Sequence, residues 1–316
     1  MDQIGHPCPR MSTLSGTLAA IAAEHQGLVT RRLARAQHVS PSVLAAALRS
    51  GGLRRLRPGV FADQAVWHAT EVHDRYALLV RGVLLGHGRW LASHHAALAL
   101  LGLPLCNVDS TLVDVVAAVR TSKRRPGLHV HVATKAQRLL VADPTSSCVT
   151  AADACVLTAA EHGFEPGVVA MDAAVKRGMA SVADLKEALN AAGIRYGAPQ
   201  AAAAIAAIDP ACESPGETRT RLILTAAGLS VRSQVALGDS AGFIGRVDFL
   251  VGERVVVEFD GAMKYEGIDG KRALVEEKRR EERLRDAGFR IVRVTWAELA
   301  RPAQLVARVR SHLAAA

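Results

Sequence analysis

Apolar residues recur every three to four positions in three short segments near the beginning of the chain. These segments, residues 12–26, 31–37 and 42–50, have the spacing of amphipathic helices. Thr30 and Ser40 precede the second and third segments, where a side-chain oxygen can accept a hydrogen bond from a backbone N–H of the first turn. The pattern predicts three helices, with a tight turn between the last two.

A basic hairpin is expected next, over residues 53–61, with its turn at Pro58-Gly59. Three helices followed by such a hairpin are typical of a winged helix-turn-helix. Seven arginines and no Asp or Glu lie between Thr30 and Pro58, and this one-sided charge favours contact with the phosphates of double-stranded DNA. The alternative is a basic helical bundle that packs on the rest of the chain. The residues that we expect to contact DNA are Arg31, Arg32, Arg49, Arg54, Arg55 and Arg57.

The middle of the chain, residues 76–205, is rich in Ala, Leu and Val and shows no arrangement of a nucleophile with a base. Strands are expected at 111–118 and 127–134, as a pair, with a basic loop at 121–126 between them. The His94-His95 pair and the His129-x-His131 alternation lack Cys partners and the i, i+4 spacing of a helical metal site, so no zinc site is expected. Helices are expected at 93–105, 151–163, 168–178 and 181–193, and residues 196–212 form either a helix or a linker.

The last hundred or so residues read as helix, three strands, helix and strand, beginning with a helix at 213–228 that Ser214 can cap. The apolar run 255–257 indicates a strand buried on both faces. Strands are expected at 231–237, on both sides of a Gly-containing turn within 245–261, and at 289–296, with a charged helix at 270–288.

The length of one turn decides whether Asp248 and Glu258 can meet, because side chains alternate between the two faces of a strand. A two-residue turn at Gly252-Glu253 would put these carboxylates on opposite faces. A three-residue loop, 252–254, would instead pair Val251 with Val255 and set Asp248 opposite Glu258. We predict the three-residue loop or an equivalent bulge, a positive φ at Gly252, and the two carboxylates within about 6 Å, close enough to share one ion.

Glu217 on the helix, Asp248 and Glu258 form the skeleton of the PD-(D/E)xK nucleases, whose carboxylates hold Mg²⁺ or Mn²⁺. The metal ligands expected here are these three residues. Asp260 replaces the lysine of the motif, and two rescues stay open: Lys264 reaches back into the site, or Asp260 binds a second metal ion. The alternative is that Glu258 and Asp260 are only polar residues at the end of a strand.

Composition and charge agree with a nucleic-acid-binding protein of several domains. The chain has 316 residues, half of them apolar, and a net charge of +9, which favours a polyanionic partner. Its five cysteines are scattered without CxxC spacing and are expected to be buried in a reducing cytoplasm. No apolar signal segment and no run approaching ~18 apolar residues is present, so a cytoplasmic protein without a membrane span is expected. We expect a multidomain α/β protein divided into residues 1–75, 76–205 and 206–316.

Two resemblances add to these expectations. The first two thirds resemble the AbiEi-type antitoxins of bacterial toxin–antitoxin and phage-defence systems, through GLVTRRLARAQHVSPSVLAAALRSGGLRRLRPGVFA, ASHHAALALLGLPL, VTAADACVLTAAEHG and VVAMDAAVKRGM in that order. This resemblance implies binding to promoter DNA and neutralisation of a nucleotidyltransferase-type toxin. The last third resembles a Vsr-like domain, through ESPGETRTRLIL, VDFLVGERVVVEFDGAMKY and REERLRDAGFRIVRVTW. It implies a restriction-endonuclease-like fold and Mg²⁺-dependent cleavage of DNA.

The sequence therefore favours a DNA endonuclease or nickase in phage defence or mobile-element biology, with catalytic residues Glu217, Asp248, Glu258, Asp260 and Lys264. The alternative is a repressor or antitoxin whose C-terminal domain kept the fold and lost the chemistry. A third class, a repair protein acting on mismatches, rests on the Vsr likeness alone.

Overall fold

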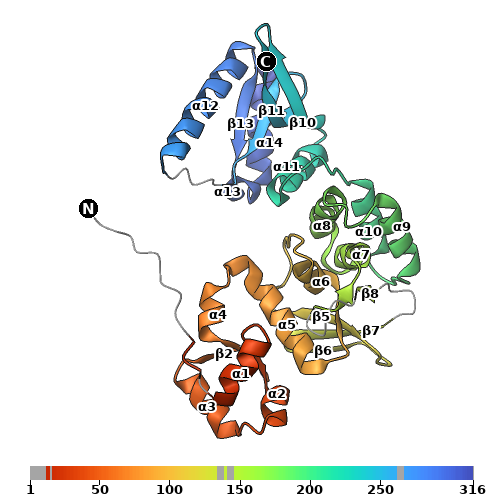
Figure 1. Ribbon diagram of the computed structural model, residues 1–316. Helices are drawn as coiled ribbons and strands as arrows, with labels where there is room; N and C mark the ends of the chain where they lie inside the picture. The colour runs from red at the N-terminus through yellow and green to blue at the C-terminus, as the bar shows by residue number, and fades with distance from the viewer. Residues whose placement is uncertain (1–11, 15, 134–138, 141–145, 262–266, 316) are drawn as a thin grey trace.

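The computed structural model of the protein describes residues 12–14, 16–133, 139–140, 146–261 and 267–315. Within them the chain is mixed α/β and forms three separate sheets, one in each third of the chain (Figure 1). Among the described residues, no helix has both the length and the apolar character needed to cross a membrane.

The N-terminal unit consists of three helices and a three-stranded antiparallel sheet with the strand order β1-β3-β2. The Thr30 hydroxyl accepts a hydrogen bond from the Leu33 N–H (3.2 Å), and that of Ser40 accepts one from Val43 (3.4 Å), so both predicted caps are confirmed. The first helix begins later than predicted, and β1 is a buried strand that the helical spacing did not reveal. The elements are α1 (Gly16–Glu24), β1 (Leu28–Thr30), α2 (Arg31–Ala36), α3 (Pro41–Arg49), β2 (Leu53–Arg57) and β3 (Val60–Asp63).

The middle region packs helices on a six-stranded sheet with the order β6-β7-β5-β4-β9-β8. The predicted strand pair is confirmed, with β5 and β7 parallel. The predicted loop at 121–126 is wrong, because Lys123–Arg125 form an exposed edge strand held to β7 through the backbone. The elements are α4 (Gln64–Ala69), η1 (Val72–Asp74), α5 (Arg75–His87), β4 (Leu91–Ala92), α6 (His94–Leu100), β5 (Val113–Ala117), β6 (Lys123–Arg125), β7 (Leu128–Val132), β8 (Leu139–Leu140), β9 (Cys148–Val149), α7 (Ala151–His162), α8 (Phe164–Lys176), α9 (Val182–Ala191) and α10 (Ala198–Ala206).

The C-terminal unit has the predicted order of helix, three strands, helix and strand, followed by two helices that were not predicted. Its sheet runs β10-β11-β12-β13, antiparallel except for the parallel pair β12–β13. Val255, Val256 and Val257 are each 0% exposed, which confirms a central strand buried on both faces. The elements are α11 (Pro215–Ala226), β10 (Val231–Asp239), β11 (Gly242–Val251), β12 (Val255–Phe259), α12 (Gly267–Asp286), β13 (Arg290–Val294), α13 (Trp296–Leu299) and α14 (Pro302–Ala314).

Helices join the three parts. Helix α5 directs Leu78 and Leu85 at the N-terminal sheet, while Val80 and Leu84 of the same helix belong to the core of the middle region. Helices α8 and α11 meet around the buried carboxylate of Asp172, which accepts hydrogen bonds from the Thr218 hydroxyl (2.8 Å) and the Arg221 guanidinium (2.9 Å).

Candidate functional site

The hairpin of β11 and β12 has the predicted register. Val251 pairs with Val255 and Phe249 with Val257, so the connecting loop holds three residues. Gly252 has φ +61°, the left-handed conformation that the sequence assigned to it. Asp248 and Glu258 are the next residues beyond the last of these pairs, and both line one cleft.

Asp248 is held by the neighbouring strand and by a glutamine of the strand on its other side. Its Oδ2 accepts a hydrogen bond from the Phe259 N–H (2.8 Å). The Gln234 Nε2 lies 3.5 Å from Asp248 Oδ1 and donates to Glu217 Oε2 at 2.9 Å. Glu217 is only 7% exposed and also accepts from the Glu213 N–H (2.8 Å). Gln234 therefore links the carboxylate of the helix to that of the sheet.

Gln234 reaches this position through an unusual backbone conformation. Its φ is +52° within β10, although it is not a glycine. Left-handed residues outside glycine cost on the order of 1 kcal/mol or more, and such strain persists where the surrounding structure requires it. The strand pairing skips this residue, passing from Ser233 with Phe249 to Val235 with Val247. Nothing in the residue pattern indicated this role, because the segment reads as an ordinary strand.

Glu258 faces the other side of the cleft and is paired with arginines. Its Oε1 accepts a short hydrogen bond from Arg280 of α12 (2.5 Å), and Arg293 of β13 lies 3.9 Å from its Oε2. The same two arginines also bind Glu277, at 2.9 and 2.6 Å. Arg280 therefore bridges Glu277 of its own helix and Glu258 of the sheet.

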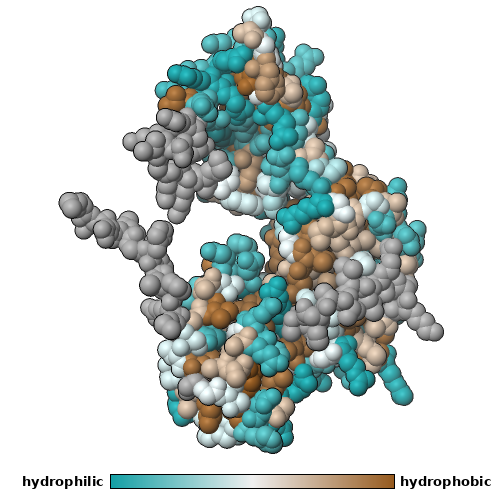
Figure 2. Space-filling view, viewed as in Figure 1, coloured by the Kyte–Doolittle hydropathy of each residue, from teal (hydrophilic) through white to brown (hydrophobic). Residues whose placement is uncertain are grey.

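The cleft between these groups has a volume of about 620 Å³ and contains both signs of charge. Hydrophilic side chains gather over the C-terminal unit in Figure 2, whereas more hydrophobic ones are exposed over the middle region. Its lining residues are Arg246, Asp248, Glu258, Phe259, Asp260, Gly261, Glu277, Lys278, Arg280, Glu281 and Arg293.

Burial, together with neighbouring carboxylates, changes the acidity of Asp248. Burial raises the pKa of Asp248 to about 6, and the nearby charges of Glu217 and Glu258 add to this, against the opposing hydrogen bond from the Phe259 N–H. A carboxylate with this pKa exchanges its proton near neutral pH, and a bound cation would favour its charged form.

The structure brings the expected site residues together in part. Asp248, Glu258 and Asp260 line one cleft, and Glu217 reaches Asp248 through Gln234. Among the described residues, however, these carboxylates do not offer three oxygens all within 4.8 Å of one another. Pairing with Arg280 occupies Glu258. Lys264 lies outside the described residues. Arg280, Arg293 and Gln234 are the members of the site that the sequence did not single out.

The six arginines expected to contact DNA divide into two kinds. Arg32 donates to the Leu85 carbonyl (2.8 Å), Arg54 stacks over the Trp67 ring (4.7 Å), and Arg57 is half-buried. Arg32 and Arg54 are exposed despite these contacts. The other three are also exposed and have no carboxylate partner among the described residues; they are Arg31 on α2, Arg49 at the end of α3 and Arg55 on β2. Arg31 and Arg55 border one hollow of about 510 Å³.

Comparison with known proteins adds no family. No family model matches the chain, and no curated protein matches it. The fold and the cleft therefore define the protein only at the level of class: a mixed α/β protein with a basic N-terminal unit and a cleft lined by carboxylates and arginines.

Proposed function

We propose that the chain binds double-stranded DNA through its N-terminal unit and hydrolyses phosphodiester bonds in the C-terminal cleft, with Mg²⁺ or Mn²⁺ held there. The observation that carries the proposal is the cleft at the β11–β12 hairpin, which Asp248 and Glu258 line together with Arg280 and Arg293. On this proposal the C-terminal unit is a restriction-endonuclease-like domain of the PD-(D/E)xK type.

The order of the N-terminal elements supports a winged helix-turn-helix. Helix, strand, two helices and a hairpin follow one another, with α3 as the recognition helix and β2–β3 as the wing. Exposed Arg31, Arg49 and Arg55 would contact phosphates, which fix the position of a protein on DNA without reading sequence. Arg32 and Arg54, although exposed, would support the unit itself, because Arg32 is bound to α5 and Arg54 lies over the Trp67 ring.

The side chains of the cleft fit the ion and the substrate. Carboxylate oxygens are the ligands that Mg²⁺ prefers, so Asp248 and Glu258, with Glu217, would hold it. When bound, the ion would supply an activated water and neutralise charge on the phosphate. Arg280 and Arg293 would bind and orient the phosphate oxygens, since guanidinium groups match them geometrically. To bind the phosphate, Arg280 would have to release its ion pair with Glu258.

Purified protein incubated with supercoiled plasmid and Mg²⁺ tests the proposal. We expect conversion to nicked or linear DNA, and its loss in Asp248→Asn. The matched control is Glu253→Gln, which removes an exposed carboxylate from the loop of the same hairpin and should cleave as the parent does. Parent protein that leaves plasmid, linear and single-stranded DNA intact with both Mg²⁺ and Mn²⁺ would exclude the nuclease.

A second candidate function is a non-catalytic repressor or antitoxin. It is favoured by the ion pair of Glu258 with Arg280, in which the protein supplies the cation itself, and by Asp260 at the position of the motif lysine. On this alternative the resemblance to AbiEi-type proteins would extend to the partner, a nucleotidyltransferase-type toxin. DNA binding without cleavage, together with co-purification of a toxin encoded beside it, would establish the regulator.

A further inference from the structure

Five histidines from three elements surround one buried aspartate in the middle region. Asp114 of β5 is 0% exposed, and every one of these rings lies against it or against another ring of the set. Their spacing along the chain predicted no metal site, because it does not show that three elements bring them together. The histidines are His94 and His95 at the start of α6, His129 and His131 on β7, and His162 at the end of α7.

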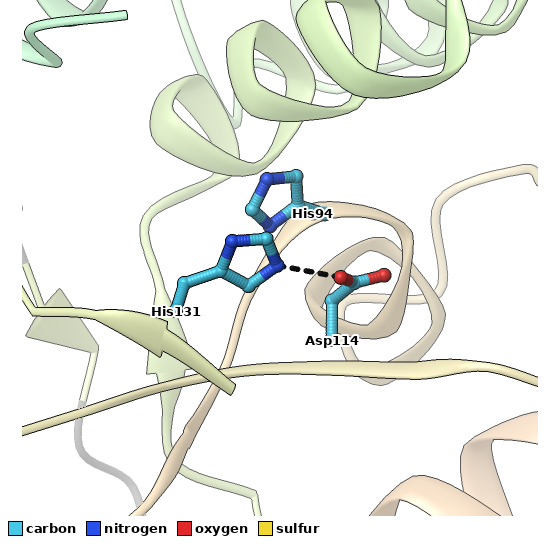
Figure 3. Close-up of side chains that lie close together, drawn as sticks. All are labelled: His94, Asp114 and His131. Atoms are coloured by element: carbon cyan, nitrogen blue, oxygen red, sulfur yellow. Dashed lines mark hydrogen bonds and ion pairs between the residues drawn. The ribbon is translucent and has the colours of Figure 1, made fainter. Parts of the chain in front are cut away.

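On one side, the aspartate is engaged by a hydrogen bond. His131 points its Nε2 at Asp114 Oδ1, 2.6 Å away, and the His94 ring lies over that of His131 (Figure 3). His94 Nδ1 in turn lies 3.0 Å from the Ser93 hydroxyl. Two donor atoms on one Zn²⁺ ion, each about 2.0–2.1 Å from it, lie roughly 3 Å or more apart. A separation of 2.6 Å is too short for that, so this side is a hydrogen-bonded support.

On the other side, three buried atoms face one another without a hydrogen bond. Asp114 Oδ2 lies 3.2 Å from His95 Nδ1 and 3.9 Å from His162 Nε2, and none of the three has a hydrogen-bond partner among the described residues. The rings of His95 and His162 meet edge to face, with centroids 4.6 Å apart. Buried polar atoms without partners are uncommon, because each loses its hydrogen bonds to water and gains none within the protein.

The tautomer of His95 sharpens this conflict. Its Nε2 lies 3.0 Å from the Leu112 carbonyl oxygen and 3.2 Å from that of Asp109. Carbonyl oxygens only accept, so Nε2 must carry a hydrogen. In a neutral ring Nδ1 is then a bare lone pair directed toward a carboxylate oxygen, and the two repel each other. A cation between them removes the repulsion, and the bond from Nε2 to a backbone carbonyl is the support that metal-binding histidines usually have.

We propose that His95 Nδ1, Asp114 Oδ2 and His162 Nε2 bind a divalent transition-metal ion such as Zn²⁺. Two imidazoles and one carboxylate are the ligand chemistry of this class of ion. His131 fixes the ligand carboxylate from behind through Asp114 Oδ1. The ion would join α6, β5 and α7, and so fasten helices to the sheet at the centre of the middle region. The competing explanation is an imidazolium of His95 that forms a buried ion pair with Asp114.

Metal binding by protein made without a polyhistidine tag distinguishes these explanations. After removal of bound metal with a chelator, titration with Co²⁺ and Zn²⁺ should show one tight site per chain. X-ray absorption of the Zn²⁺ form should show two imidazoles in the coordination shell. His162→Gln removes a ligand, so it should weaken affinity by more than the about 10–100-fold that loss of a residue supporting a ligand costs. His87→Gln is the control, since His87 is an exposed histidine stacked on Trp90, outside the set around Asp114.

Circular dichroism of the metal-free His162→Gln variant shows whether it is folded, and the X-ray absorption measurement needs no variant. Three results would overturn the proposal: absence of stoichiometric binding to the parent, a spectrum without two imidazoles, or unchanged affinity in folded His162→Gln. The first of these would leave the buried His95–Asp114 ion pair as the explanation. None of these measurements involves DNA cleavage, so their failure leaves the proposed function unaffected.

Discussion

At the scale of single residues, the cleft shows how one side chain can organise two others. Gln234 supplies a single amide that reaches Glu217 and Asp248, and its left-handed backbone is what allows this. Two carboxylates that would repel each other are thereby kept apart but within reach. The strained backbone of Gln234 lowers the stability of the fold locally, and the arrangement of the cleft requires it.

Asp248 gives a prediction about stability and pH. Its pKa in the folded protein is about 6, above its ordinary value of 3.8, so the charged form destabilises the fold. That cost is absent at low pH and appears as pH rises from about 4 through 6. Asp248→Asn should therefore be more stable than the parent at pH 7.5, by on the order of 1–2 kcal/mol after allowance for partial exposure. The gain should shrink toward zero at pH 4, as urea unfolding at both pH values would show. A gain that does not depend on pH would contradict the raised pKa.

At the scale of elements, exposed arginines distinguish the surface of the N-terminal unit. Replacing Arg31, Arg49 and Arg55 by Gln should weaken binding to duplex DNA of any sequence. The slope of log K against log salt concentration should flatten by about 0.9 for each phosphate that the variant no longer neutralises. The triple variant Arg195→Gln, Arg232→Gln, Arg301→Gln removes the same charge from exposed positions elsewhere. If both triple variants weaken binding equally, net charge and not this unit accounts for the affinity.

The loop 252–254 sets the register of the hairpin, because the apolar Val255, Val256 and Val257 fit either face equally well. Inserting one glycine after Gly252 should therefore rotate the hairpin pairing and separate Asp248 from Glu258. The pKa of Asp248 should fall toward its ordinary value, and any cleavage should be abolished. Inserting two glycines preserves the alternation and should retain both properties. NMR titration of the Asp248 carboxyl measures the first effect whether or not the protein is an enzyme.

Local signals in the sequence predicted the N-terminal helix caps and the β11–β12 loop well. Thr30 and Ser40 cap helices because the groups they bind lie three residues away, and the loop after Val251 follows from the alternation of side chains. Long-range convergence could not be predicted in the same way. His95 and His162 come from helices far apart along the chain, so their spacing does not show that they meet. Glu258 pairs with Arg280 of α12, and the sequence could not show which carboxylate this arginine would bind.

At the scale of the whole molecule, a buried ion pair connects the middle region to the C-terminal unit. Asp172 on α8 is 2% exposed and receives Arg221 and Thr218 of α11, together with the Asp209 N–H (2.8 Å). Burial raises the pKa of Asp172, against the opposing effect of these donors. Their number indicates a fixed attachment, since a buried charge needs every partner to offset its lost hydration.

Asp172→Ala should destabilise the protein by about 3 kcal/mol, because Arg221 would stay largely buried with only Asp209, 3.7 Å away, as a carboxylate partner among the described residues. Lys176→Gln is the control at the same junction. Its ion pair with Glu213 is partly exposed, with side chains 36% and 41% accessible, and should contribute less than about 1 kcal/mol. Unfolding in urea measures both. Equal effects of the two substitutions would show that Asp172 is not the attachment.

Helix α5 limits how the N-terminal unit can be separated or recombined. Leu78 and Leu85 cover Leu28 and Ala62 of its sheet, and a Cβ at Gly82 would lie 2.4 Å from Val60, so helix and sheet are closely fitted. The boundary drawn from the sequence at residue 75 would cut this unit off from its own cover. A fragment ending there would expose an apolar sheet face and aggregate, whereas one ending after His87 would carry the cover with it. Gene fusions that transplant this N-terminal unit would therefore have to take α5 as well, and with it the apolar face that α5 presents to the middle region.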